Sequence, residues 1–167
     1  MLCSPCQKAS QNGFTMIELI TVIAIVGVLS VAMMPASSNI SGNVFNARGF
    51  HHETLALLRF GQKSAIAQRR TVCVVFSDTS LKLRIATNSV TPTCSIDLQG
   101  PKGGSTPSAT ITAKSGVSYS TRPQDFNFNG LGQPVDGSAA LVVTQVIQVG
   151  NAFNSITVEA TTGYIHE

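Results

Sequence analysis

Charged residues are scarce in this chain of 167 residues, and only 11% of the positions hold Asp, Glu, Lys or Arg. Lys8 is the one charged residue among the first 13, which leaves ten basic and eight acidic side chains in the remainder. The net charge outside that short N-terminal stretch is therefore +2. Nucleic-acid affinity depends on many phosphate contacts from basic side chains, so this composition argues against nucleic acid as a partner.

The sequence also lacks the short motifs that accompany most catalytic sites. It contains no nucleophile elbow and no paired-carboxylate motif, and Gly103-Gly104-Ser105 falls short of the G-x-x-x-x-G-K-[ST] phosphate-binding loop. His51 and His52 are adjacent, and neighbouring side chains on a helix point about 100° apart. We expect a solvated helix start there rather than a metal site, and we predict a protein that is not an enzyme and needs no cofactor.

One long apolar run stands out against this background. The 21 residues from Phe14 to Met34 are predominantly apolar and include a single acid, Glu18. A helix of about 20 residues can cross a bilayer, and no small-residue cleavage site follows the run, so we expect a retained anchor with any cut upstream of it. A charge inside the bilayer costs roughly 2.5–3.5 kcal/mol, so Glu18 requires a partner.

Residues 13–19, with the sequence GFTMIEL, resemble the prepilin signature of type IV pilins and of type II secretion pseudopilins. Gly13 and Phe14 stand at the expected cut, and Glu18 follows Phe14 by four residues. Pro35 also falls where pilin helices usually carry a proline. The resemblance implies that a prepilin peptidase cuts between Gly13 and Phe14 on the cytoplasmic side and that the new Phe14 amine is then methylated.

The same resemblance implies a role for Glu18 in assembly. The Phe14 amine of one subunit and the Glu18 carboxylate of its neighbour would neutralise each other as helices stack in a filament, which removes the cost of burying either charge. The chain would first be a single-pass protein of the bacterial inner membrane with its domain in the periplasm, and later part of a pilus at the cell surface. Its partners would be other major and minor pilins, the prepilin peptidase and the inner-membrane assembly platform.

The composition along the chain predicts four segments. They are a leader over residues 1–13, a transmembrane and assembly helix over 14–35, a linker and amphipathic helix over 36–70, and a β-rich globular domain over 71–167. Residues 36–46 are small and polar, with poor helix propensity, and predict a kink or linker. A helical stripe resumes at Phe50 and ends near Arg69 and Arg70, where cations suit the helix macrodipole. Gly61 within the stripe predicts a close approach to a sheet.

The remainder of the chain reads as short strands. Residues 71–76 are β-branched and apolar, and residues 81–85 alternate with a period of two. Further short strands are expected at 111–112, 117–119, 126–128, 140–149 and 155–159. A long N-terminal helix followed by an antiparallel β domain is an α+β architecture, and this order agrees with the type IV pilin fold, in which the helix packs on the sheet.

The four cysteines fall into two pairs. Cys3 and Cys6 form a C-x-x-C in the leader, which looks like a metal or redox motif but lacks a second pair. Cys73 and Cys94 would remain after processing, in a domain that the resemblance places in an oxidising compartment. We predict that they form a disulfide, which closes a 22-residue loop and contributes about 3 kcal/mol. The alternative is two buried free thiols.

Residues 125–136 allow two interpretations. Asp125, Asn127 and Asn129 fit the start of a calcium loop, with Asp136 at its twelfth position. The final ligand of such a loop is a longer, bidentate Glu, and the flanks of this one look like strands. We therefore favour a strand followed by a turn over residues 130–134.

The pattern F-x-x-x-G-x-P over residues 128–134 resembles the pseudopilin H and FimT-type group of minor pilins. Residues 47–59, 65–74 and 162–166 are similar to minor pilins of the mannose-sensitive haemagglutinin (MSHA) pilus. These resemblances imply a minor pilin of a type IVa pilus that helps to initiate or cap the filament.

Two alternatives have the same kind of anchor. One is an H-type pseudopilin of a type II secretion system, and the less favoured one is a FimT-like receptor for DNA uptake. FimT-type pilins that bind DNA carry arginines around a terminal Gly-Arg motif. In this chain Tyr164 follows Gly163, and residues 161–167 contain no Lys or Arg.

Overall fold

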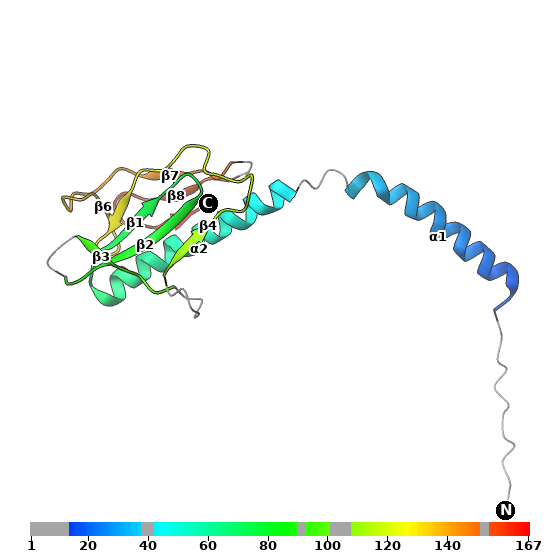
Figure 1. The fold of residues 1–167 in the computed structure, drawn as a ribbon, viewed down its shortest axis with the longest axis horizontal. Helices are drawn as coiled ribbons and strands as arrows, with labels where there is room; N and C mark the ends of the chain where they lie inside the picture. The colour runs from blue at the N-terminus through cyan, green and yellow to red at the C-terminus, as the bar shows by residue number, and fades with distance from the viewer. Residues whose placement is uncertain (1–13, 38–41, 90–92, 101–107, 151–153) are drawn as a thin grey trace, which may run out of the picture. The chain divides into compact units, whose positions relative to one another are not determined.

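The computed structural model describes residues 14–37, 42–89, 93–100, 108–150 and 154–167, with backbone alone over 31–37. The chain divides into two compact units, Met1–Ile40 and Ser41–Glu167. The first unit contains helix α1, Met16–Ser37, and the second contains helix α2, Gly42–Gln68, and the strands that follow it (Figure 1). None of the helices in the described part of the chain is both long enough and apolar enough to cross a membrane.

The second unit is built on antiparallel sheets. The larger sheet has the strand order β3-β2-β1-β5-β6, and β4 pairs with β2. Its bounds are β1 Val72–Phe76, β2 Ser80–Ala86, β3 Cys94–Asp97, β4 Thr110–Thr112, β5 Phe126–Phe128 and β6 Pro134–Val135. A smaller sheet has the order β7-β8-β9, formed by Gln145–Ile147, Ile156–Val158 and Ile165–His166. Helix and antiparallel sheet together confirm the predicted α+β class.

Helix α2 packs one face on the larger sheet, as Figure 1 shows. Gly61 allows the close approach that its position predicts, because a Cβ at this residue would lie 3.0 Å from Cδ1 of Leu83 and 3.7 Å from Cγ1 of Val72. The buried residues of α2 are Ala47, Phe50, His51, Thr54, Leu55, Leu57, Leu58, Gly61, Ser64 and Ala65.

Helix α2 ends at Gln68 in a Schellman arrangement. The amide of Arg69 donates to the Ile66 carbonyl at 3.3 Å, and the amide of Arg70 donates to the Ala65 carbonyl at 3.2 Å. Arg69 adopts a φ of 49°, the left-handed conformation that this motif requires. The expectation of cations in the last turn was wrong, because both arginines follow the helix and the Arg70 guanidinium donates to the Ala86 carbonyl of β2.

Several predicted strands are confirmed, and two are not. The strands expected at 71–76, 81–85, 111–112, 126–128 and 155–159 correspond to β1, β2, β4, β5 and β8. Residues 117–119 form only an isolated bridge from Tyr119 to Val149, and residues 140–149 contain β7 alone. The apolar pattern of residues 117–119 reflects side-chain packing, since Val117 and Tyr119 are both buried in the core without a ladder around them.

The core continues through a row of aromatic rings. The ring of Tyr119 lies 5.1 Å from Phe50 of α2 and 5.6 Å from Phe76 of β1, measured between centroids. Its hydroxyl lies 3.2 Å from Oγ1 of the fully buried Thr54, which itself donates to the Phe50 carbonyl at 2.8 Å. The hydroxyl of Tyr119 is thus the donor to Thr54, and the ring fixes the helix on the sheet.

We predict that Tyr119 makes the folded state sensitive to alkali. Burial raises the pKa of Tyr119 to about 12, whereas an unfolded tyrosine titrates near pH 10. The contribution is fully present below about pH 10 and is lost as the pH rises through about 12, which amounts to about 2 to 3 kcal/mol. Urea unfolding at rising pH should show this loss in the wild type and a smaller loss in Tyr119→Phe. The exposed Tyr164→Phe is the control and should behave like the wild type; equal losses in all three proteins would contradict the assignment.

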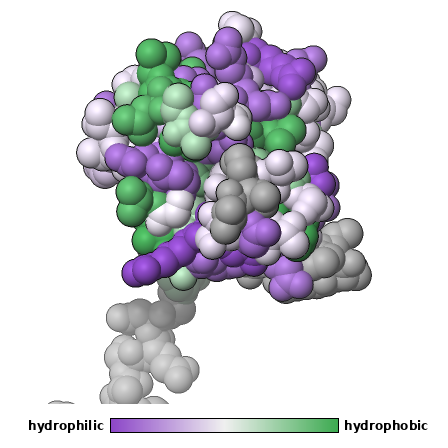
Figure 2. Space-filling view, turned by 90° about the vertical axis from the view of Figure 1, so that its left-hand side faces the viewer, coloured by the Kyte–Doolittle hydropathy of each residue, from purple (hydrophilic) through white to green (hydrophobic). Residues whose placement is uncertain are grey.

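Apolar side chains also reach the surface of the second unit. Leu131, Leu141, Val143, Val146 and Tyr164 are all more than half exposed. Figure 2 shows one face of the molecule, on which hydrophobic residues form separate groups between hydrophilic ones. Among the described residues, this face therefore presents small apolar groups rather than one continuous patch.

Candidate assembly and processing segment

The start of α1 is fixed by Thr15. Its Oγ1 accepts the amide of Glu18 at 3.4 Å, and its carbonyl accepts the amides of Glu18 and Leu19 at 3.1 and 3.3 Å. Thr15 followed three residues later by Glu18 has the order of a capping box, so the sequence also carries a local signal for the start of this helix. Glu18 lies in the first turn, where the positive end of the macrodipole favours a carboxylate by roughly 0.3–1 kcal/mol.

Over residues 16–30, whose side chains are described, helix α1 presents apolar side chains in every direction. Thr21 and Ser30 do not change this, because their hydroxyls donate back to the carbonyls of Glu18 and Val26 at 2.9 and 2.7 Å. A helix that is hydrophobic all round is suited to a buried position in a core or a membrane. The exposed apolar residues are Phe14, Met16, Ile17, Leu19, Ile20, Val22, Ile23, Ile25, Val26, Val28 and Leu29.

The other residues of the predicted assembly segment are placed as follows. Gly13 lies outside the described residues, and Phe14 precedes α1 with a side chain that is 84% exposed. Pro35 lies within α1, two residues before its end at Ser37, and has no amide proton to donate to the helix. The segment expected as a kink or linker is helical at 36–37 and again from Gly42 onward, while residues 38–41 lie outside the described part.

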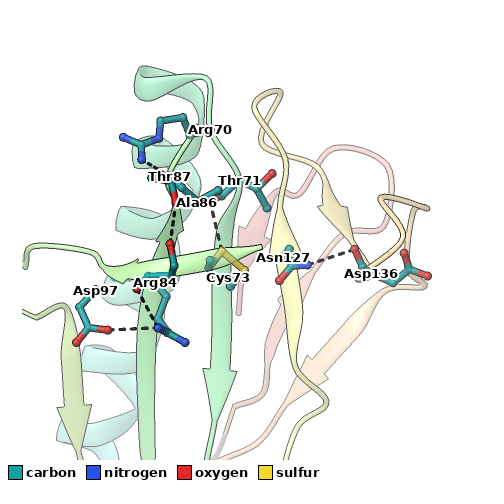
Figure 3. Close-up of a disulfide and its surroundings, with 11 residues drawn as sticks. Arg70, Thr71, Cys73, Arg84, Ala86, Thr87, Asp97, Asn127 and Asp136 are labelled. Carbon is teal, nitrogen blue, oxygen red and sulfur yellow. Dashed lines mark hydrogen bonds and ion pairs between the residues drawn. A yellow bond between two sulfur atoms is a disulfide. The ribbon is translucent and has the colours of Figure 1, made fainter. Parts of the chain in front are cut away.

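Cys73 and Cys94 form a disulfide, the pairing that the sequence predicts. Cys73 lies on β1 and Cys94 begins β3, with β2 between them in the sheet. The register between β2 and β3 shifts at Ile85/Ala86, beside the pair Ala86↔Cys94. At this irregularity the two cysteine Cα atoms are 6.0 Å apart, and Figure 3 shows the bond crossing the end of the sheet.

The four candidate calcium ligands each have another role. Oδ1 of Asp125 accepts the amide of Phe76 at 2.8 Å. Oδ1 of Asn129 accepts two amides within its own turn, and Oδ1 of Asp136 does the same in the next turn. Asn127 donates to the Asp136 carbonyl at 3.2 Å, as Figure 3 shows. The side-chain oxygens of Asn129 and Asp136 therefore cap turns, and that of Asp125 binds the β1 backbone. The favoured interpretation of a strand followed by a turn is the one that the structure shows in β5 and β6.

The turn over residues 130–134 meets the C-terminal turn on the surface of α2. Nε2 of Gln62 donates to the carbonyl of Gly132 at 3.0 Å and to the carbonyl of Gly163 at 2.8 Å. Both glycines have positive φ, 82° and 67° respectively. A Cβ on Gly132 would lie 2.7 Å from Cδ1 of Ile66, and a Cβ on Gly163 would lie 2.0 Å from the Gly132 carbonyl oxygen. Glycine is therefore required at both positions.

The histidine pair of α2 meets the end of the chain. Nε2 of His51 lies 3.1 Å and Nδ1 of His52 lies 3.7 Å from Oε1 of Glu167. The expected solvated helix start was wrong for His51, because α2 begins nine residues earlier at Gly42 and places His51 on its buried face. His52 is exposed, as expected. No local sequence signal predicts that Glu167 contacts these histidines, because it is 116 residues from His51.

The last residues form a small polar and aromatic cluster. The ring of Tyr164 stacks on His166 with centroids 5.2 Å apart and an angle of 23° between the planes. Nε2 of His166 lies 3.1 Å from Oε1 of Glu159, and this hydrogen bond raises the pKa of His166. The exposed ring of Tyr164 thus stacks within the chain.

Comparison with known proteins places the N-terminal segment in a recognised group. Residues 8–34 match the family described as the prokaryotic N-terminal methylation motif. This N-terminal segment is similar to those of type IV pilins. The motif contains Phe14, the Thr15 cap and Glu18, so the exposed acid at the start of a predominantly apolar helix belongs to a known kind of segment.

Two relatives show how far this likeness extends. The Type IV major pilin protein PilE1 of Neisseria gonorrhoeae is 45% identical over 58 residues, which cover 35% of this chain and 32% of that protein. The fimbrial protein of Neisseria meningitidis serogroup B is 45% identical over 58 residues, which cover 35% and 31%. The match therefore spans about a third of the length of these pilins. No solved structure matches the chain. The α+β arrangement of helix and antiparallel sheets is consistent with this likeness.

Proposed function

We propose that the chain is a minor pilin of a type IVa, MSHA-like pilus, most similar to its minor pilin C, and that it helps to initiate or cap the filament. The observation that carries the proposal is the methylation motif at residues 8–34 on a helix that is apolar on all described sides. The resemblance of residues 47–59 and 65–74 to MSHA minor pilins supports the finer assignment. The turn containing Gly132, which resembles the minor-pilin pattern, supports it as well.

The proposed path begins in the inner membrane. A prepilin peptidase removes residues 1–13 and the Phe14 amine is methylated, which leaves a cation at the start of α1 beside the exposed Phe14 side chain. The helix is held in the bilayer with the second unit in the periplasm. The assembly platform then moves the protein into a bundle of pilin helices, where the apolar surface of α1 is covered by other subunits.

Glu18 specifies the position of the subunit in that bundle. The Thr15 cap and the helix start hold the carboxylate in the first turn, one turn away from the Phe14 amine along the helix. Moving an unpaired carboxylate into an apolar bundle is costly, and a cation on the neighbouring subunit offsets that cost. The bundle therefore forms in the register that pairs Glu18, and the corresponding acid of each other pilin, with the N-terminal amine of a neighbouring subunit.

Deletion of the gene separates this proposal from its alternatives. We expect surface filaments to be strongly reduced and the chain to be present in sheared wild-type filaments in small amounts relative to the major pilin. Secretion of folded exoproteins should be unchanged. Intact filaments with blocked secretion would instead indicate an H-type pseudopilin, and intact filaments with lost DNA uptake would indicate a FimT-like receptor.

A further inference from the structure

Three potential metal ligands lie close together in the second unit, two of them on α2 and the third just after β9. They are Nε2 of His51, Nδ1 of His52 and a carboxylate oxygen of Glu167, and all three ligand atoms lie within 4.8 Å of one another. We propose that His51, His52 and Glu167 bind a divalent transition metal of the zinc type. The proposal is independent of the role of the chain in a filament.

The donor set identifies the class of metal. Two imidazole nitrogens and one carboxylate oxygen form the His₂Glu set that zinc uses when a fourth position stays open to water. Calcium and magnesium prefer sites made of oxygen ligands alone, so the two histidines argue against them. Imidazole suits zinc, copper, iron and nickel, and two histidines with one carboxylate are also the facial triad of non-haem iron(II). The donor set therefore indicates a divalent transition metal, and zinc is the probe used below.

The distances are close to those of a tetrahedral site. Ligand atoms about 2.0–2.1 Å from zinc lie roughly 3.3 Å from one another. Oε1 of Glu167 is 3.1 Å from Nε2 of His51 and 3.7 Å from Nδ1 of His52. The ligand nitrogens of His51 and His52 lie within 4.8 Å of one another, so this separation must shorten by up to about 1.5 Å to reach the tetrahedral value. The 68% exposed side chain of His52 is free to rotate toward the other two ligands.

Adjacent helical histidines converge here because they use different nitrogens. The rings of His51 and His52 are nearly perpendicular, at 82°, with centroids 5.4 Å apart. His51 extends its distal Nε2, whereas His52 presents the proximal Nδ1. Glu167 approaches from the end of the chain and lies within reach of both nitrogens, which overcomes the angular separation of neighbouring helix positions.

The surroundings keep the carboxylate charged and oriented. Oε2 of Glu167 accepts from Nδ2 of Asn154 at 3.4 Å, which leaves Oε1 directed at the histidines. Hydrogen bonds from His51 and Asn154 lower the pKa of Glu167. Nε and Nη2 of Arg59 donate to the Ile165 carbonyl at 3.2 and 2.9 Å, which fixes β9 against α2 just before the ligand. Outer groups of this kind orient metal ligands.

The buried position of His51 adds a second observation. This side chain is 4% exposed, and its Nδ1 has no hydrogen-bond partner among the described residues. Without a metal, Nε2 donates its proton to Oε1 of Glu167 at 3.1 Å. A bound ion would take the place of that proton, and Nδ1 would then carry the proton of the neutral ring. The exposed His52 and Glu167 leave one side of the site open for entry of the ion and for water.

Zinc titration of the untagged full-length protein in detergent tests the proposal. The background carries Cys3→Ser and Cys6→Ser, so that the C-x-x-C of the leader does not bind the added metal. Competition with a chromophoric zinc chelator should show one Zn²⁺ per chain. His52→Ala and Glu167→Gln should each weaken binding by about tenfold or more, and both change exposed side chains, so the fold is retained.

His166→Ala is the matched control, because it removes the one other histidine of the chain, next to a ligand but outside the cluster. Its zinc affinity should equal that of the unchanged protein, because His166 contributes no ligand atom to the cluster. Cobalt in place of zinc should give the visible absorption of a four-coordinate site only where His52 is present. Absence of stoichiometric binding, or equal affinity in His52→Ala and the unchanged protein, would overturn the proposal.

Discussion

Glu18→Ala should remove the protein from filaments while leaving it in the membrane. The substitution deletes the acid at the start of a helix that is otherwise apolar, so retention in the bilayer should be equal or better. In the filament it leaves the amine of a neighbouring Phe14 without its counter-charge. Removing one partner of a buried ion pair costs about 3–5 kcal/mol, which corresponds to a loss of incorporation of about a hundredfold or more. Immunoblots of sheared filaments and of membrane fractions measure both quantities.

Thr21→Ala is the control for Glu18→Ala. It lies on the same helix, and its hydroxyl donates only to the Glu18 carbonyl at 2.9 Å among its described contacts. This variant should enter filaments at the wild-type level, because it exposes no unpaired charge. Normal incorporation of Glu18→Ala would show that the acid does not pair with the neighbouring subunit.

Among substitutions that add a single methyl group in the second unit, Gly163→Ala should lower the free energy of unfolding the most. Gly163 has a φ of 67°, and the added Cβ would lie 2.0 Å from the Gly132 carbonyl oxygen and 2.8 Å from Nε2 of Gln62. No rotation of a flexible side chain relieves a clash with backbone. The C-terminal turn must move and give up the hydrogen bonds from Gln62, so we expect a loss of about 3–5 kcal/mol in the free energy of unfolding.

Gly137→Ala provides the matched glycine for this comparison. A Cβ at Gly137 has nothing within 4 Å, and its φ is outside the left-handed region. Urea unfolding of this variant should lie within about 0.5 kcal/mol of the wild type. If Gly163→Ala were equally mild, the contact between the two turns would not exist in solution.

Local residue patterns in the sequence predicted two strands and the helix that packs on them. The alternation in 81–85 and the β-branched run in 71–76 indicated a pair of strands, which are β2 and β1. The helical stripe with Gly61 indicated a helix that approaches a sheet closely, and Leu83 lies where that helix packs. Cys73 and Cys94 are joined as predicted. The strand and helix signals come from residues close together in the sequence, whereas the disulfide prediction depended on the oxidising compartment that the prepilin resemblance implies.

Features that depend on distant residues were not predictable. The strands β6 and β9 have two residues each, which is too few for a periodic signal. Strand β3 has the sequence CSID, in which Ile96 is the one residue with a strong β preference. The approach of Glu167 to His51 and of Gly163 to Gly132 arises only when the C-terminal hairpin returns to α2. The aromatic row shows the same limit, since Tyr119 looked like part of a strand but acts through its ring.

The mass of the mature N-terminus tests the central claim most directly. The protein isolated from the envelope should begin at Phe14, carry one added methyl group on its amine and lack the first 13 residues. Gly13→Val should remain as a longer precursor, because the bulkier side chain stands at the bond to be cut. A wild-type product that retains the first 13 residues, or one that begins beyond the apolar run at Met34, would contradict the account.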